Sequence, residues 1–166
     1  MDGRVLVAYA SKSGGTAEIA EALAKAMREA GVDAEARQAA EVTDLAGYGA
    51  AVVGSGVYAG RWAGDARKFV KSHKRDLRGM PTWLFCSGPT GGGPKEDAAV
   101  AAAGPGVMDR SMQKIDVGAR GYATFAGRVG DGMGGPFERF VPKGDWRDFD
   151  QIAAWGRQIA AELADA

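Results

Sequence analysis

The sequence predicts an α/β fold, a three-layer sandwich in which helices cover both faces of a five-stranded parallel sheet of order 2-1-3-4-5. Short apolar segments alternate with amphipathic segments about five times along the chain, and parallel strands need such crossover connections. The apolar segments are nearly continuous, which is typical of strands buried on both faces. No internal repeat or long linker interrupts the sequence, so we expect one domain over residues 1–166.

The N-terminal segments establish this alternation. Arg4–Ala10 is a short apolar, β-branched run and predicts a buried strand. Thr16–Ala30 carries large apolar residues at four-residue spacing, which predicts an amphipathic helix that ends at Gly31. Val32–Arg37 is more polar, so we expect an edge strand there.

The remaining segments repeat the alternation to the end of the chain. The predicted strands are Ala50–Ser55, Pro81–Ser87 and Ala119–Val129. The predicted helices are Ala63–Lys74, Val107–Ile115 and Trp146–Leu163. Asp145 is expected to cap the last helix, whose inward stripe includes either Trp155 or Gly156.

The charge balance and the apolar runs exclude several classes of protein. The 21 basic and 21 acidic residues give no global electrostatic reason to expect a nucleic-acid partner. No apolar run approaches the roughly 20 residues of a transmembrane helix, and the N-terminus does not resemble a signal peptide. We therefore expect a cytoplasmic protein. The basic stretch Lys71–Arg78 is expected to be a solvated face, with contact to an acidic partner protein as the alternative.

The sequence contains one cysteine and one histidine, which limits the chemistry of any site. Cys86 has no second cysteine for an internal disulfide or a metal cage, and we expect it to be a small buried apolar residue. His73 stands near the end of a predicted helix among basic residues, so we expect a helix-terminal cation or a surface residue. No metal site is predicted.

In this strand order, ligands bind where the carboxyl ends of strands 1, 3 and 4 meet. Small and hydroxyl residues follow strand 1 and lead directly into a helix, an arrangement that favours a phosphate-binding loop. The loop residues are Ser11, Lys12, Ser13, Gly14, Gly15 and Thr16. The alternative is a simple Ser/Thr helix cap. The loop lacks the glycine patterns of nucleoside triphosphate and dinucleotide sites, and strand 3 lacks the terminal carboxylate of a phosphoacceptor receiver.

The pattern S-x-S-G-x-T at Ser11, Ser13, Gly14 and Thr16 resembles the phosphate loop of flavodoxins. The resemblance implies a flavodoxin-like fold and a loop that holds the 5′-phosphate of FMN without a metal. It also implies that the loops after strands 3 and 4 border the flavin ring. Those residues are Gly56, Val57, Tyr58, Ala59 and Gly60, followed by Ser87, Gly88, Pro89, Thr90, Gly91 and Gly92. Tyr58 or Trp62 is expected to supply a stacking face, unless Trp62 only anchors the following helix.

The chain also resembles the short flavodoxin-fold family that includes menaquinone-dependent protoporphyrinogen IX dehydrogenase. The similar stretches are VVGSGVYAGRW, Phe69–His73, Leu77–Pro81 and Gly144–Trp146. That enzyme carries a long basic and apolar insertion near the fifth strand. The corresponding region here, residues 127–143, is short and rich in glycine.

Three functions are consistent with these patterns. The first is electron transfer to a redox partner protein, and the second is a small flavin oxidoreductase acting on a quinone or porphyrinogen. The third is a non-catalytic flavin-binding module. Flavodoxins that act as shuttles are strongly acidic, whereas this sequence has no net charge, and this difference favours the second function over the first.

Overall fold

The computed structural model describes residues 2–12, 14–58, 61–88, 114–129 and 144–166. Strands and helices alternate along most of this chain. In sequence order they are β1 (Arg4–Ala10), α1 (Gly15–Glu29), β2 (Ala34–Gln38), η1 (Ala39–Glu41), β3 (Tyr48–Tyr58), β4 (Arg61–Trp62), α2 (Gly64–Ser72), α3 (Lys74–Arg78), β5 (Thr82–Gly88), β6 (Gly121–Ala126), β7 (Arg128–Val129), β8 (Gly144–Asp145) and α6 (Phe149–Ala164).

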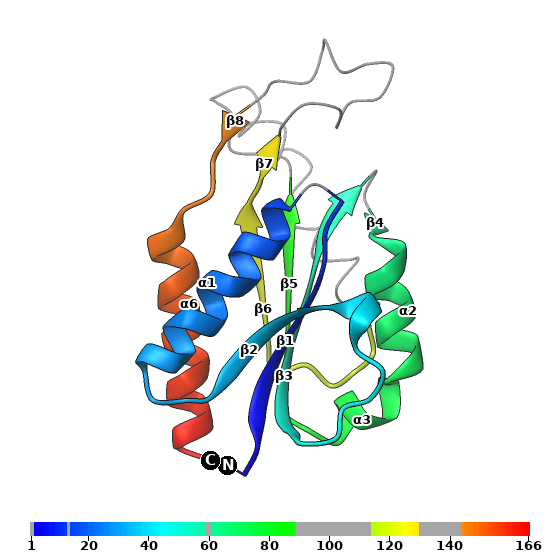
Figure 1. Cartoon of the computed structure of the whole chain (residues 1–166), viewed down its shortest axis with the longest axis vertical. Helices are drawn as coiled ribbons and strands as arrows, with labels where there is room; N and C mark the ends of the chain where they lie inside the picture. The colour runs from blue at the N-terminus through cyan, green and yellow to red at the C-terminus, as the bar shows by residue number, and fades with distance from the viewer. Residues whose placement is uncertain (1, 13, 59–60, 89–113, 130–143) are drawn as a thin grey trace.

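The central sheet has the predicted topology. Its strands lie in the order β2-β1-β3-β5-β6, and each neighbouring pair is parallel. Since β5 and β6 are the fourth and fifth of these strands along the chain, the predicted order 2-1-3-4-5 is confirmed. The chain order reverses at β1, which lies between β2 and β3 (Figure 1).

Side chains of each buried strand alternate between two apolar layers. Val5 and Val7 of β1 pack with α1 and α6, whereas Leu6 and Ala8 pack with η1, α2 and α3. Figure 1 shows α1 and α6 on one side of the sheet and α2 and α3 on the other. The predicted three-layer arrangement is therefore confirmed. Cys86 is fully buried in the second layer, as expected.

Gly156 allows α6 to lie very close to α1. A Cβ atom at this position would lie 3.0 Å from the Cβ of Ala26 and 3.1 Å from the carbonyl oxygen of Leu23. The adjacent Trp155 instead packs its ring edge-on against Phe85 and Phe125. Of the two residues proposed for the inward stripe, Gly156 is the one at the helix contact, and Trp155 lies beside it.

The predicted cap of the last helix is wrong. Asp145 lies in β8, and its carboxylate binds Arg147. The helix begins at Phe149, and the carboxylate of Asp148 accepts hydrogen bonds from the N–H groups of Asp150 and Gln151. Asp148 therefore satisfies the unpaired donors of the first turn.

Two other predicted elements differ from those in the structure. The expected helix Ala63–Lys74 is two helices, which meet at His73. His73 is the C-cap of α2, so it stands at a helix end as the expected terminal residue would. Its side chain is only 12% exposed, and its ring centroid lies 4.8 Å from that of Phe69, so it is not an exposed surface residue. The fifth strand is shorter than expected and spans Gly121–Ala126. The predicted helix Val107–Ile115 falls mostly outside the described residues.

Candidate functional site

The ends of the central strands and the start of α1 lie along one edge of the sheet (Figure 1). β1, β3 and β5 are parallel neighbours, so their carboxyl ends point to this edge. The predicted segment directly follows β1, which ends at Ala10, whereas the other two segments begin inside a strand rather than after it. Gly56–Tyr58 belong to β3, and Ser87–Gly88 belong to β5. The topology thus brings the described parts of the three predicted segments to the same edge of the sheet.

The loop after β1 turns sharply into α1. The Ser11 Oγ accepts a hydrogen bond of 2.9 Å from the Gly14 N–H. Gly14 has a φ of 83°, in the left-handed region where glycine is favoured. Gly14 is also the N-cap of α1, a position at which the residue itself has no side chain to cap the helix. Ser13 lies outside the described residues, and Lys12 is exposed.

Thr16 occupies the first turn of α1 and is only 3% exposed. Its hydroxyl oxygen is not among the fully enclosed polar atoms that lack a partner, since Trp62 Nε1 is the one such side-chain atom in the described chain. The N–H groups of the first helical turn, at Gly15, Thr16 and Ala17, also have no acceptor within the helix. A hydroxyl beside these donors, at the positive end of a helix, fits a bound phosphate.

The end of β3 is fixed by a buried serine that the sequence analysis did not identify. The Ser55 Oγ donates to the carbonyl oxygen of Gly56 at 2.7 Å and accepts from the Ala63 N–H at 2.8 Å. The chain then returns as β4, antiparallel to the end of β3, an unpredicted hairpin. Ser55 therefore connects the end of β3 to Ala63, the residue that precedes α2.

The two aromatic residues of this hairpin are Trp62, whose side chain is described, and Tyr58, whose side chain is not. Val57 pairs with Trp62 in the hairpin. Trp62 is 3% exposed within the α2 layer, which supports its anchoring role. Its Nε1 atom is buried and has no hydrogen-bond partner among the described residues. Tyr58 ends β3, but its side chain and residues Ala59 and Gly60 lie outside the described part of the chain, so flavin stacking by Tyr58 stays a prediction.

The end of β5 has little room for side chains. Ser87 is 8% exposed, and Gly88 pairs with Ala126 of β6. A Cβ atom on Gly127 would lie 2.3 Å from the carbonyl oxygen of Gly88, so glycine is required there. The rest of the predicted segment falls outside the described residues: Pro89, Thr90, Gly91 and Gly92.

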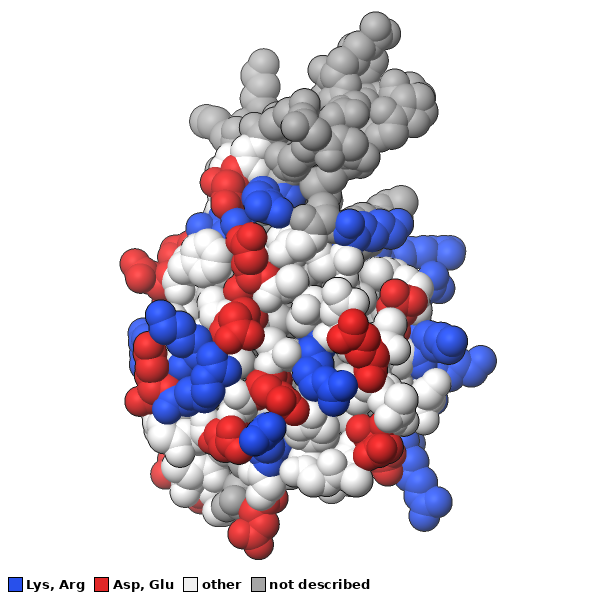
Figure 2. All heavy atoms as spheres, viewed as in Figure 1, with Lys and Arg blue, Asp and Glu red and all other residues white. Residues whose placement is uncertain are grey.

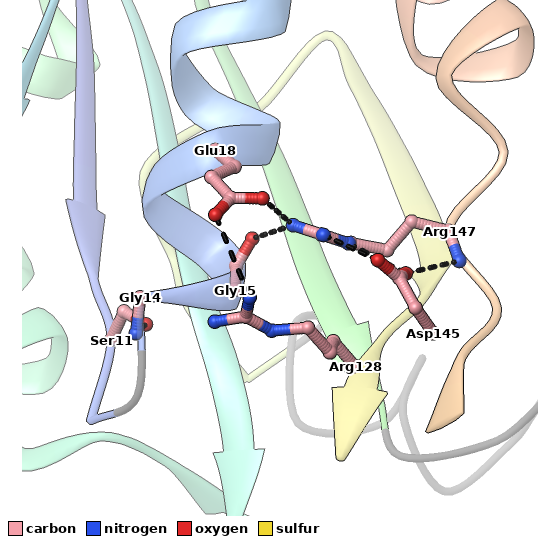
Figure 3. A network of polar contacts seen from close by, with 7 residues as sticks. All are labelled: Ser11, Gly14, Gly15, Glu18, Arg128, Asp145 and Arg147. Atoms are coloured by element: carbon pink, nitrogen blue, oxygen red, sulfur yellow. Dashed lines mark hydrogen bonds and ion pairs between the residues drawn. The ribbon is translucent and has the colours of Figure 1, made fainter. Parts of the chain in front are cut away.

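A network of charged groups connects the start of α1 to β8 and the residues that follow it (Figure 3). The Arg147 side chain is only 4% exposed. Its guanidinium donates to the Gly15 carbonyl oxygen at 3.3 Å, to the carboxylate of Glu18, and to both carboxylate oxygens of Asp145, at 2.8 and 2.6 Å. Arg147 thus holds the first turn of α1 against β8.

Arg128 contributes a second guanidinium beside the loop (Figure 3). Its Nη1 lies 3.7 Å from the Glu18 carboxylate. A Cβ atom on Gly14 would lie 3.7 Å from the Nη2 of Arg128. β7 pairs with β8 so that Arg128 faces Asp145 in register. Sequence reasoning missed both arginines, because their contacts with the start of α1 join residues that are more than one hundred positions apart.

We expect the Asp145–Arg147 pair to make stability depend on pH in acid. The hydrogen bond from Arg147 lowers the pKa of Asp145 to about 2, from an ordinary value of 3.8. Stabilisation is therefore fully present above pH 4 and is lost as the pH falls through about 2. Asp145 is 46% exposed, so the contribution is about 1 kcal/mol or less.

Urea unfolding between pH 7 and pH 2 tests this expectation. Asp145→Asn is expected to be slightly less stable than the wild type at pH 7 and to converge with it near pH 2. Asp165→Asn, at the exposed end of α6 and in no ion pair of the described chain, is the matched control. Parallel curves for the wild type and Asp145→Asn over the whole range would contradict the assignment.

The described residues contain neither a cluster of metal-ligating side chains nor a membrane-spanning helix. In this part of the chain no three His, Cys, Asp or Glu side chains gather as a metal site would require. No helix among the same residues is long and apolar enough to cross a bilayer.

Comparison with solved structures shows the same fold in flavodoxins. A flavodoxin from the domain Archaea matches with a TM-score of 0.64 and 18% identity, over 97% of this chain and 99% of that one. The flavodoxin of Streptococcus pneumonia TIGR4 matches with a TM-score of 0.60 and 20% identity, over 98% and 99%. Rubredoxin oxygen:oxidoreductase of Desulfovibrio gigas matches with a TM-score of 0.63 and 16% identity, over 98% of this chain but 36% of that one.

The sequence comparisons give the family. No curated protein sequence matches the chain significantly. The family model described as a flavodoxin domain matches residues 6–141 of the 166. This chain therefore belongs to the flavodoxin domain family.

Proposed function

We propose that this protein binds FMN at the carboxyl edge of the sheet and transfers electrons through it. The observation that carries the proposal is the loop of residues 11–16, where a left-handed glycine leads into a helix whose first turn holds the threonine hydroxyl of Thr16 and N–H groups without an acceptor in the helix. The family and the fold support the same conclusion. Bound FMN supplies reversible uptake and release of one or two electrons.

The residues of the first loop fit the phosphate of FMN. The hydroxyls of Ser11, Ser13 and Thr16 would donate to phosphate oxygens, together with the free N–H groups of the first turn of α1. Ser11 also keeps the loop closed through its bond to Gly14. We further propose that the segments Gly56–Gly60 and Ser87–Gly92 border the flavin ring, with Tyr58 as the stacking residue.

Glu18 is the one feature of this turn that opposes a phosphate, because like charges repel. Its carboxylate is paired with Arg147 and lies within 3.7 Å of Arg128. These two guanidinium groups offset the carboxylate charge at the start of α1. The loop can therefore bind an anion without a metal ion, as the resemblance to flavodoxins implies.

The second candidate function is an FMN-dependent oxidoreductase acting on a quinone or a porphyrinogen. The balanced net charge favours this candidate, since a shuttle that steers toward basic partners carries an excess of acidic residues. The subtype represented by menaquinone-dependent protoporphyrinogen IX dehydrogenase belongs here as a proposal. A non-catalytic flavin-binding module is the third.

The first test is an absorbance spectrum of the purified protein, followed by titration with FMN. We expect one FMN per chain, with flavin bands in the visible region and fluorescence quenched on binding. Failure to bind FMN would contradict the proposal and leave only the fold. If FMN binds, steady-state reduction of quinones or oxidation of protoporphyrinogen would identify an enzyme, and the midpoint potentials would separate a shuttle from a non-catalytic module.

A further inference from the structure

The segment from β4 to α3 is strongly basic although the whole chain is neutral. Residues 61–78 contain seven Lys and Arg residues and two acidic residues. All seven are exposed, and we call them the α2–α3 basic face: Arg61, Arg67, Lys68, Lys71, Lys74, Arg75 and Arg78. Figure 2, viewed as in Figure 1, shows Lys and Arg side chains along the flank where α2 and α3 lie. The remainder of the chain is correspondingly acidic in excess.

Most of these charges are not offset by neighbouring carboxylates. Lys74 and Arg78 form ion pairs with Asp116, at 3.3 and 2.8 Å. The other five basic residues of the face form no ion pair in the described chain. The unpaired charges lie mostly on β4 and α2, so the positive potential is largest at that end of the face.

That end of the face adjoins the proposed flavin site. β4 pairs directly with the end of β3, and the bond between Ser55 and Ala63 fixes the residue before α2. Arg61 and the first turns of α2 therefore lie at the same edge of the sheet as the loop of residues 11–16. A protein bound to this face would be near the flavin.

The face carries charge without apolar anchors. Among the described residues, the exposed large apolar side chains are Tyr122 and Phe149, and neither belongs to this face. Membrane-binding helices combine basic residues with exposed apolar ones that enter the bilayer. Charge alone is suited to a complementary acidic surface, as in transient protein–protein encounters.

We propose that the α2–α3 basic face docks an acidic redox partner protein beside the flavin, which rests on the proposed binding of FMN. The sign of the charge on this face is therefore opposite to that of an acidic surface, which would attract a basic partner. In the docked complex one electron passes between the flavin and the partner's redox centre, so the flavin loses the electron that the partner gains, or the reverse.

The experiment follows electron transfer from the chemically reduced, FMN-loaded protein to two haem proteins of opposite charge. The acidic acceptor is the soluble haem domain of cytochrome b5, and the basic acceptor is cytochrome c, each reduced by one electron per haem. We expect the rate with the acidic acceptor to fall as salt is added, because screening weakens attraction. The variant Lys68→Glu/Lys71→Glu is expected to lower this rate at low salt by about fivefold to tenfold.

The matched control is Lys25→Glu/Arg157→Glu, which makes the same change in net charge on α1 and α6, in the opposite layer. We expect it to change the rate by less than about twofold. An equal loss in both variants, or a rate that rises with salt, would overturn the proposal. The proposal would also be overturned if the wild type sediments with phosphatidylglycerol vesicles and Lys68→Glu/Lys71→Glu does not. That result would show that the face binds a membrane. The affinity for FMN is measured by titration for the wild type and all variants. If the wild type does not bind FMN, the result refutes the proposed function and leaves the docking proposal separate from it.

Discussion

Replacement of Gly54 by alanine is expected to destabilise the protein by about 2–3 kcal/mol, the upper range for adding atoms to a packed core. A Cβ atom at Gly54 would lie between 2.0 and 2.4 Å from three atoms of the Phe85 ring. The ring cannot move aside easily, because Phe85 is fully buried and packs against Phe125 and Trp155. Urea unfolding followed by circular dichroism measures the loss.

A double-mutant cycle with Phe85→Leu separates this clash from other effects of the new methyl group. Leucine lacks the outer ring atoms that a Cβ at Gly54 would meet, so the single variant is expected to lose stability only through a cavity. The double variant is then expected to be more stable than the sum of the single effects predicts, by about 1 kcal/mol or more. Additive effects, or a Gly54→Ala protein as stable as the wild type, would contradict the argument.

The sheet and its layers were predictable because they depend on patterns within short stretches of sequence. Continuous apolar runs such as Arg4–Ala10 are typical of buried parallel strands, and the structure confirms this strand and its order in the sheet. The loop of residues 11–16 was also predictable, since its residues are adjacent and directly follow a strand. The sequence pattern does not reveal at which position packing requires a glycine. Gly54 and Gly56 look alike in the sequence, but only the structure shows that a side chain at Gly54 would collide with Phe85.

The parts that were missed depend on contacts between distant residues. Arg147 reaches Gly15 and Glu18 across the fold, and no local pattern distinguishes it from an ordinary surface arginine. Arg147 also explains the error at Asp145. The carboxylate of Asp145 binds Arg147, and Asp148 caps the helix instead. The β3–β4 hairpin depends likewise on the buried hydroxyl of Ser55.

Removal of two loop hydroxyls is expected to have the largest effect on the proposed site. Ser13→Ala/Thr16→Ala is expected to weaken FMN binding at least about tenfold, since each lost bond to a charged acceptor costs about 1.5–3 kcal/mol. Thr16 is buried beside free backbone donors, so water cannot readily replace its hydroxyl at the phosphate. Quenching of FMN fluorescence measures the dissociation constant.

The control is Thr43→Ala/Ser72→Ala, which removes two exposed hydroxyls before β3 and at the end of α2, away from the carboxyl edge. This variant is expected to bind FMN like the wild type. A thermal melt establishes that both variants are folded. If the loop variant is folded and binds FMN with unchanged affinity, the phosphate does not lie at residues 11–16. The carboxyl edge would then retain the geometry of a flavodoxin, but its ligand would have to be held by the other two segments.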